Sequence, residues 1–154
     1  MVARSFVWIG QDLPGIEGLA KQQKAIARLP DGLLEALAPA VDKGADLFLE
    51  TAKGVCPVND LDPHPGDLQA SGKKQDAKTA IGIGKLVVFD ARDEHGRFYA
   101  KHVEAGHMDK RGGGHVPPKP WFWPAYQHVK KPIRAGIARA ANRALKRMFG
   151  DAAS

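Results

Sequence analysis

The sequence holds a single cysteine, Cys56, among 154 residues. One cysteine excludes a disulfide within the chain and is typical of proteins made in a reducing compartment. The sequence also lacks any run of 18 apolar residues, so no transmembrane helix is expected. The opening MVARSFVWIGQDLPG has too short an apolar run for a secretory signal. We therefore expect a protein that stays in the cytoplasm in which it is made.

Acidic residues are scarce in the last third of the chain. Residues 101–154 carry 11 Lys and Arg against 3 Asp and Glu, a net charge of +8, whereas residues 1–100 carry 12 against 14, a net charge of −2. A basic segment of this kind suits an acidic partner, either nucleic acid or an acidic protein surface. Charge alone leaves a plain solvated helix face as an equal alternative.

Two stretches have the periodicity of amphipathic helices. Pro39 in the first and Pro132 in the second predict kinks, and a break into two helices at Pro39 is the competing interpretation. Residues 31–55 place on one stripe Leu34, Leu37, Val41, Ala45, Phe48, Ala52 and Val55. A helix of about 25 residues from Trp121 onward has an apolar stripe of Tyr126, Val129, Ile133, Ile137, Ala140, Ala144 and Met148.

The remaining segments are shorter. Residues 56–71 are rich in Pro and Asp and predict a loop, while residues 78–103 read as strands with a turn at DEHG. A short strand is expected at residues 4–10 and a weakly patterned helix at residues 14–29. The order predicts one α+β domain over residues 1–154, in which a small antiparallel sheet packs against a long central helix and a long C-terminal helix.

No group of residues has the spacing of a catalytic or metal site. His102 and His107 stand five apart, where a zinc-protease helix needs four, and they would diverge by about 140° on a helix. Gly106 argues against a helix there, and His115 would join them only if the glycine-rich loop folded back. A metal-dependent hydrolase using these three histidines is the weakest alternative.

The sequence also gives little support for nucleotide binding or for nucleophilic catalysis. The segment GIGK, at residues 82–85, lacks the spacing of a phosphate-binding loop, and Ser71 and Cys56 lack the setting of a nucleophile. We therefore expect no enzyme and no catalytic, metal-binding or cofactor-binding residues.

The three consecutive aromatic residues in PWFWPAY, at positions 121–123, cannot all face inward on one helix. We expect one ring to lie in the core and another to contact a partner, as exposed tryptophans often do in interfaces.

Several short motifs occur in a defined order. A helix runs into A-x-x-x-C-P-V, and G-D-L-Q-A-S, at residues 66–71, comes next. Strands, Y-A-K-H-V-E-A-G at residues 99–106, and P-W-F-W-P-A before the last helix complete the order. Residues 31–149 resemble the tailed-bacteriophage neck or tail-completion proteins, which include minor-tail-protein-Z-like components. The residues that match the motifs are Gly66, Leu68, Ser71, Tyr99, Ala100, Val103, Glu104, Gly106, Pro120, Pro124 and Ala125.

The sequence departs from the family pattern in three places. They are a longer proline-rich insertion at residues 59–65, Ala105 where an aromatic residue is common, and a histidine-bearing MDKRGGGH loop. Trp121 also replaces the usual Phe. These departures bear on loop contacts and leave the expected fold unchanged.

The resemblance implies a structural virion protein at the head–tail interface or tail top. Such a protein forms a homo-oligomeric ring, expected to be a hexamer, binds other phage neck and tail proteins, and contacts packaged DNA without reading its sequence. It needs no cofactor and no membrane, and it passes through the host cytoplasm during assembly. Residues 1–30 are an N-terminal extension, and residues 107–119 are a flexible loop that orders on assembly.

The resemblance and the residue types together give candidate site residues. Glu104 is expected to hydrogen-bond backbone amides at the root of the loop. The interface is expected to include Trp121, Trp123, Arg111 and His115. A basic face is expected to comprise Lys131, Arg134, Arg139, Arg143 and Lys146. The alternative function is that of a small basic nucleic-acid-binding accessory protein.

Overall fold

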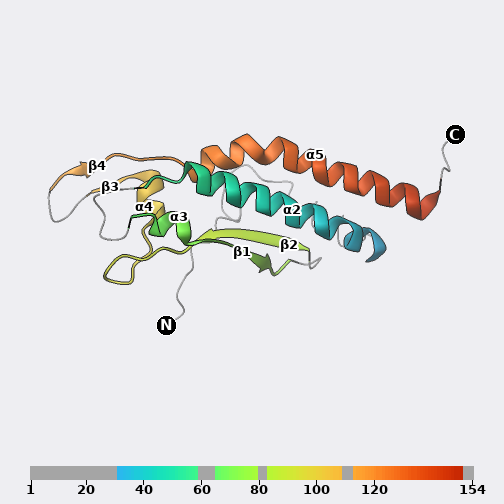
Figure 1. Ribbon diagram of the computed structural model, residues 1–154, viewed down its shortest axis with the longest axis horizontal. Coiled ribbons are helices and arrows are strands. Elements are labelled where there is room, and N and C mark those ends of the chain that lie inside the picture. Colours follow the sequence, from blue (N-terminus) through green and yellow to red (C-terminus); the bar gives the residue numbers. More distant parts are fainter. Residues whose placement is uncertain (1–30, 59–64, 80–82, 109–112, 151–154) are drawn as a thin grey trace.

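The computed structural model describes residues 31–58, 65–79, 83–108 and 113–150, and the predicted elements at residues 4–10 and 14–29 lie outside them. Two long helices dominate the fold, α2 (Asp31–Val55) and α5 (Phe122–Phe149). They run antiparallel side by side, because Gly32 near the start of α2 lies beside Met148, and Phe48 near its end packs on Phe122. Figure 1 shows α5 above α2, with strands β1 (Gly72–Ala77) and β2 (Gly84–Phe89) below α2.

Helix α2 is continuous through Pro39, as the kinked-helix interpretation predicts. Pro39 is exposed, so water can bind the backbone carbonyl that the proline leaves without a donor. The predicted stripe is only partly buried. Leu37 is 8% exposed and Ala52 is fully covered, whereas Val55 is 53% exposed at the end of the helix.

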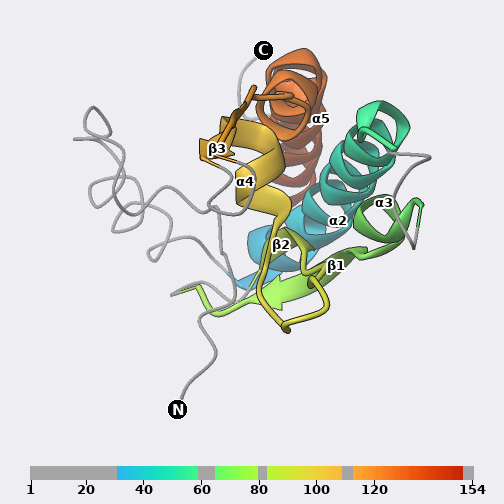
Figure 2. The ribbon, with the colours of Figure 1, turned by 90° about the vertical axis from the view of Figure 1, so that its left-hand side faces the viewer.

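The β-sheet lies against α2 and is a two-stranded antiparallel ribbon. Strand β1 (Gly72–Ala77) pairs with β2 (Gly84–Phe89) in a register that joins Gly72 to Phe89 and Ala77 to Gly84. The fold is therefore α+β, with a small antiparallel sheet packed against a long helix and a long C-terminal helix, as predicted. Figure 2 views the ribbon and the two helices from the end.

Ion pairs tie the ribbon to α2. The Nζ of Lys74 lies 2.8 Å from a carboxylate oxygen of Asp42 and 2.6 Å from one of Asp46, and Lys85 pairs with Asp42 and Asp76. The Lys74 hydrogen bond holds the pKa of Asp42 below its usual value. A lowered carboxyl pKa gives stability that is present above the unfolded pKa and is lost as the pH falls through the folded one.

Three local predictions are wrong. Residues 72–77 form a strand outside the predicted strand region, and α3 (Asp67–Ala70) is a helical turn within the predicted loop. Helix α4 (Ala100–Ala105) replaces the predicted end of a strand, and Gly106 ends this helix instead of preventing it. The DEHG turn is confirmed, because the Gly96 amide donates to the Asp93 carbonyl at 2.8 Å.

The predicted loop at residues 107–119 contains regular structure. Strand β3 (His107–Met108) pairs antiparallel with β4 (His115–Val116), and all four residues are exposed. The two strands form the stem of a hairpin arm that extends beyond the helix pair in Figure 1. Residues 109–112 between them lie outside the described part of the chain.

The buried side chains form two clusters along the helix pair. The smaller cluster, toward the start of α2, joins Leu33 and Leu37 to Ala140 and Ala144. The larger cluster gathers segments from the whole chain at the other end. Its members are Ala52, Cys56, Leu68, Phe89, Ala91, Ala100, Trp121 and Ala125.

A close contact between the two long helices generates a stability prediction. Gly44 of α2 is buried, and a Cβ atom placed there would lie 2.9 Å from the Cγ2 atom of Ile133. Gly44→Ala is expected to lower the free energy of unfolding by about 1 kcal/mol through overpacking. Urea denaturation measures the change.

The matched control is Gly136→Ala in α5, where a Cβ atom would meet nothing within 4 Å. This substitution is expected to raise the free energy of unfolding by about 0.5–1 kcal/mol, because alanine favours a helix interior over glycine. Equal stabilisation by both substitutions would contradict the close packing at Gly44.

Candidate functional site

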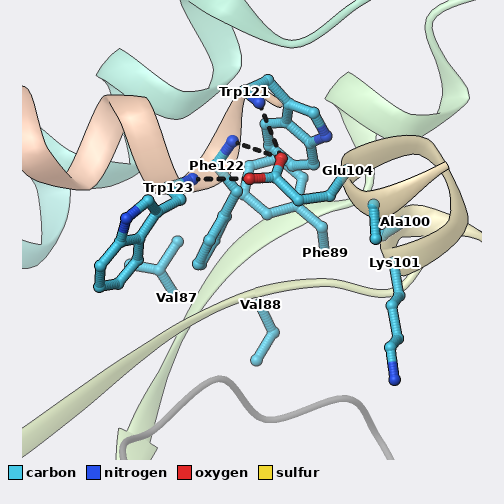
Figure 3. A pocket seen from close by; sticks show the side chains of 10 residues that line it. Val87, Val88, Phe89, Ala100, Lys101, Glu104, Trp121, Phe122 and Trp123 are labelled. Carbon is cyan, nitrogen blue, oxygen red and sulfur yellow. Dashed lines mark hydrogen bonds between the residues drawn. The ribbon is translucent and has the colours of Figure 1, made fainter. Parts of the chain in front are cut away.

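The start of α5 is held by a carboxylate from another element. The first amide groups of a helix lack partners within it, and Trp121 at the N-cap provides no side-chain hydrogen bond. Glu104 of α4 fills this role. Its Oε2 accepts from the amides of Trp121 at 2.7 Å and Phe122 at 3.0 Å, and its Oε1 accepts from the amide of Trp123 at 3.1 Å (Figure 3).

The negative charge of Glu104 suits this position, because a helix N-terminus carries a partial positive charge. The expected bonding of Glu104 to backbone amides is therefore confirmed. The amides belong to the segment in which the loop returns to the helix.

Gly106 sets the direction in which the chain leaves α4. Its φ of 71° is in the left-handed region, and a Cβ atom there would lie 2.7 Å from the Val116 carbonyl oxygen and 2.8 Å from the Pro118 nitrogen. Any other residue would push the returning strand away. The amide of Lys119 donates to the Val103 carbonyl at 2.9 Å, so both sides of the hairpin are fastened to α4.

The three consecutive aromatic residues have different environments. Trp121 is 3% exposed and packs edge-to-face on Phe89 with ring centroids 4.5 Å apart. Phe122 is half-buried and contacts Phe48 at 5.0 Å, whereas Trp123 is 42% exposed and lies over Tyr126. The prediction that one ring lies in the core is confirmed, and the contact of another ring with a partner stays a prediction. Trp121, however, is a core residue, and its place among the predicted interface residues is wrong.

The second motif reaches the same core. Gly66 has a φ of 89° before α3, Leu68 is 4% exposed in the larger cluster, and the Ser71 hydroxyl donates to the Leu68 carbonyl at 2.7 Å. The Gln69 side chain donates to the Lys53 carbonyl near the end of α2 at 2.7 Å. The hydrogen bond from Ser71 to Leu68 closes a local turn at the end of α3. Tyr99 and Val103 are half-buried and pack against this cluster, and Pro120 and Pro124 are exposed.

The histidines come closer together than the sequence indicates. Because Gly106 turns the chain after α4, His107 lies outside the helix, and the divergence expected for two histidines on one helix does not apply. The rings of His102 and His107 meet edge-to-face with centroids 5.4 Å apart. His115 pairs with Met108 and not with His107 across the hairpin. Within the described segments, no three His, Cys, Asp or Glu side chains gather as a metal site would require.

The candidate nucleophile Cys56 and the candidate phosphate contact Lys85 both lie in environments that explain them as structural residues. Cys56 is 7% exposed, and burial raises the pKa of its thiol to about 11, which keeps it protonated at neutral pH. Lys85 of the GIGK segment is engaged with Asp42 and Asp76, and Gly82 lies outside the described residues.

A cavity of about 90 Å³ opens beside the Glu104 contact. Strand β2, α4 and the first turn of α5 enclose it, as Figure 3 shows. No sequence motif predicts this cavity, although the β-branched and aromatic run KLVVF indicates the strand that forms one side of it. The lining residues are Val87, Val88, Phe89, Ala100, Lys101, Glu104, Ala105, Trp121, Phe122 and Trp123.

Helix α5 has a cationic surface. It contains seven Lys and Arg and no Asp or Glu. All five residues of the predicted basic face are exposed, and no ion pair joins them to a carboxylate in the described part of the chain: Lys131, Arg134, Arg139, Arg143 and Lys146. Of the other predicted interface residues, His115 and Trp123 are exposed and Arg111 lies outside the described residues.

Comparison with known proteins identifies no relative of this chain. No protein-family model, no curated protein and no solved structure matches the chain. None of the helices among the described residues combines the length and apolar character that crossing a membrane requires.

The Glu104 contact gives a second stability prediction. Glu104→Ala leaves three helix amides without their acceptor and is expected to lower the free energy of unfolding by about 1–3 kcal/mol. Glu50→Ala, at an exposed carboxylate of α2, is the control and is expected to change it by less than about 0.5 kcal/mol. Chemical denaturation of both variants measures the difference. Equal effects would show that Glu104 does not hold α5.

Proposed function

We propose that this protein is a structural virion protein of a tailed phage or phage-like particle. It acts at the head–tail interface or tail top as a ring-forming neck or tail-completion component. The observation that carries the proposal is the meeting of the motifs on which the resemblance rests. Glu104 of the Y-A-K-H-V-E-A-G motif binds the amides of the P-W-F-W-P-A motif, and Leu68 of the G-D-L-Q-A-S motif shares their core.

This convergence supports the resemblance because the motifs have interdependent structural roles. Gly106, Glu104 and Trp121 differ in chemistry, yet all three take part in the junction between α4, the hairpin and α5. Short motifs that occurred together by chance would have no reason to make contact. Their contacts therefore support an architecture shared with that family.

The surfaces that remain suit an assembly protein. Met108 is 63% exposed on the hairpin arm, and Trp123 is 42% exposed at the start of α5. Large apolar side chains of this kind serve as anchors in protein interfaces. The cations of α5, which pair with no carboxylate among the described residues, form a separate surface. This surface would neutralise phosphates of DNA that passes through a ring without reading its bases.

Electron microscopy of particles tests the proposal. Deletion of the gene is expected to leave separate DNA-filled heads and tails, or tails of abnormal length. Trp123→Ser is expected to give the same defect with a folded protein, because it removes an exposed anchor. Gln127→Ser, at an exposed residue one turn away on α5, is the control and is expected to assemble normally. Complete, normal particles from the deletion would contradict the proposal.

The α5 cations also favour a second candidate, a nucleic-acid-binding accessory protein. This candidate predicts tight binding of the isolated protein to duplex DNA with a steep dependence on salt, whereas the main proposal predicts weak and salt-labile binding. Fluorescence anisotropy at several salt concentrations distinguishes them.

A matched pair of triple variants locates any binding that is found. Replacing Lys131, Arg134 and Arg139 by Gln is expected to abolish it and reduce the salt dependence. Replacing Lys43, Lys78 and Lys119, three exposed lysines on other segments, is expected to have a smaller effect. Equal losses from both variants would show that the basic face of α5 is not the binding surface.

A further inference from the structure

Strand β2 has one edge that no other described strand pairs with. It bonds to β1 along its full length, and alternate residues direct their N–H and C=O groups away from β1. An open strand edge is a template for another strand unless the chain protects it.

The two edges of the ribbon differ in character. Strand β1 has the sequence GKKQDA, and its lysines pair with Asp90, Asp42 and Asp46. Lysine-rich strands of this kind discourage edge pairing. Strand β2 has the sequence GKLVVF, which is apolar over its last four residues. The β2 edge is therefore the one suited to receive a strand.

The cavity described above borders the last three residues of β2. Its lining includes the consecutive residues Val87, Val88 and Phe89, whose side chains alternate between the faces of the sheet. Figure 3 shows Val87 and Val88 on β2 with Trp123 above Val87. A cavity of about 150 Å³ holds a benzene molecule, so the 90 Å³ here accommodates an aliphatic side chain or part of an aromatic ring.

We propose that residues 4–10 of the same chain add to the open edge of β2 as a third strand and place an apolar side chain in the cavity. The segment reads RSFVWIG, with Phe6 and Trp8 on one face and Val7 and Ile9 on the other. Its length matches the six residues of β2. Its four consecutive apolar residues complement the apolar edge and the aromatic lining of the cavity.

The chain is long enough for this docking. Residues 11–30 separate the segment from the start of α2, and twenty residues span up to about 66 Å. Helix α2 is only about 37 Å long, and Lys85 of β2 pairs with Asp42, less than halfway along it. The inference does not depend on the proposed function, because it concerns how one chain closes its own sheet.

Residue-resolved amide hydrogen exchange of the full chain tests the proposal. The β2 amides that point away from β1 are expected to exchange slowly. They should accelerate at least about tenfold in either Phe6→Asp with Trp8→Asp or Val7→Asp with Ile9→Asp. Val2→Asp is the matched control and is expected to leave them unchanged. The β2 amides that face β1 report whether each variant is still folded.

Two results would overturn the proposal. Rapid exchange of the outward-facing amides in the unmodified chain would show that the edge is open. Slow exchange that is lost on dilution would show that the strand comes from a second copy or another partner. Protection that is independent of protein concentration and lost in one of the paired variants supports docking within the chain.

Discussion

The contact between Glu104 and the start of α5 organises the end of the molecule that carries the hairpin arm. One carboxylate satisfies three helix amides, and its position requires α4, which in turn requires the turn at Gly106. The same contact directs the three aromatic residues, so that Trp121 enters the core and Trp123 stays at the surface. The hairpin arm leaves and returns between the two partners. Loss of this single interaction would therefore affect the core, the arm and the exposed anchor together.

Charge is divided unevenly between the two long helices. The carboxylates of Asp42 and Asp46 in α2 are used by the lysines of the ribbon. Helix α5 has no acidic residues, and its cations have no ion-pair partner among the described residues. The ribbon and α2 thus neutralise each other, and the net positive charge of the protein is concentrated on the opposite helix. A surface of this kind suits the phosphate backbone of DNA in a ring or in a simpler complex.

The long helices and the apolar strand were predictable because each has a regular apolar pattern. Strand β1 was not, because GKKQDA is polar and becomes a strand only through its pairing with β2 and its ion pairs to α2. Helix α4 could not be predicted, because its six residues are too few to show periodicity and Gly106 at its end disfavours a helix. The role of Glu104 could be anticipated from the motif, whereas the inward direction of Trp121 depends on tertiary packing against Phe89. The cavity beside them joins three segments that no local pattern connects.

The most direct measurement is the exchange rate of the amides of Trp121, Phe122 and Trp123, observed by NMR in the unmodified protein and in Glu104→Gln. Amides in the first turn of a helix have no partner within it and exchange readily. Capping by Glu104 predicts slow exchange at all three in the unmodified protein and faster exchange in the variant, while amides in the middle of α5 stay unchanged. Equal rates in the two proteins would contradict the account.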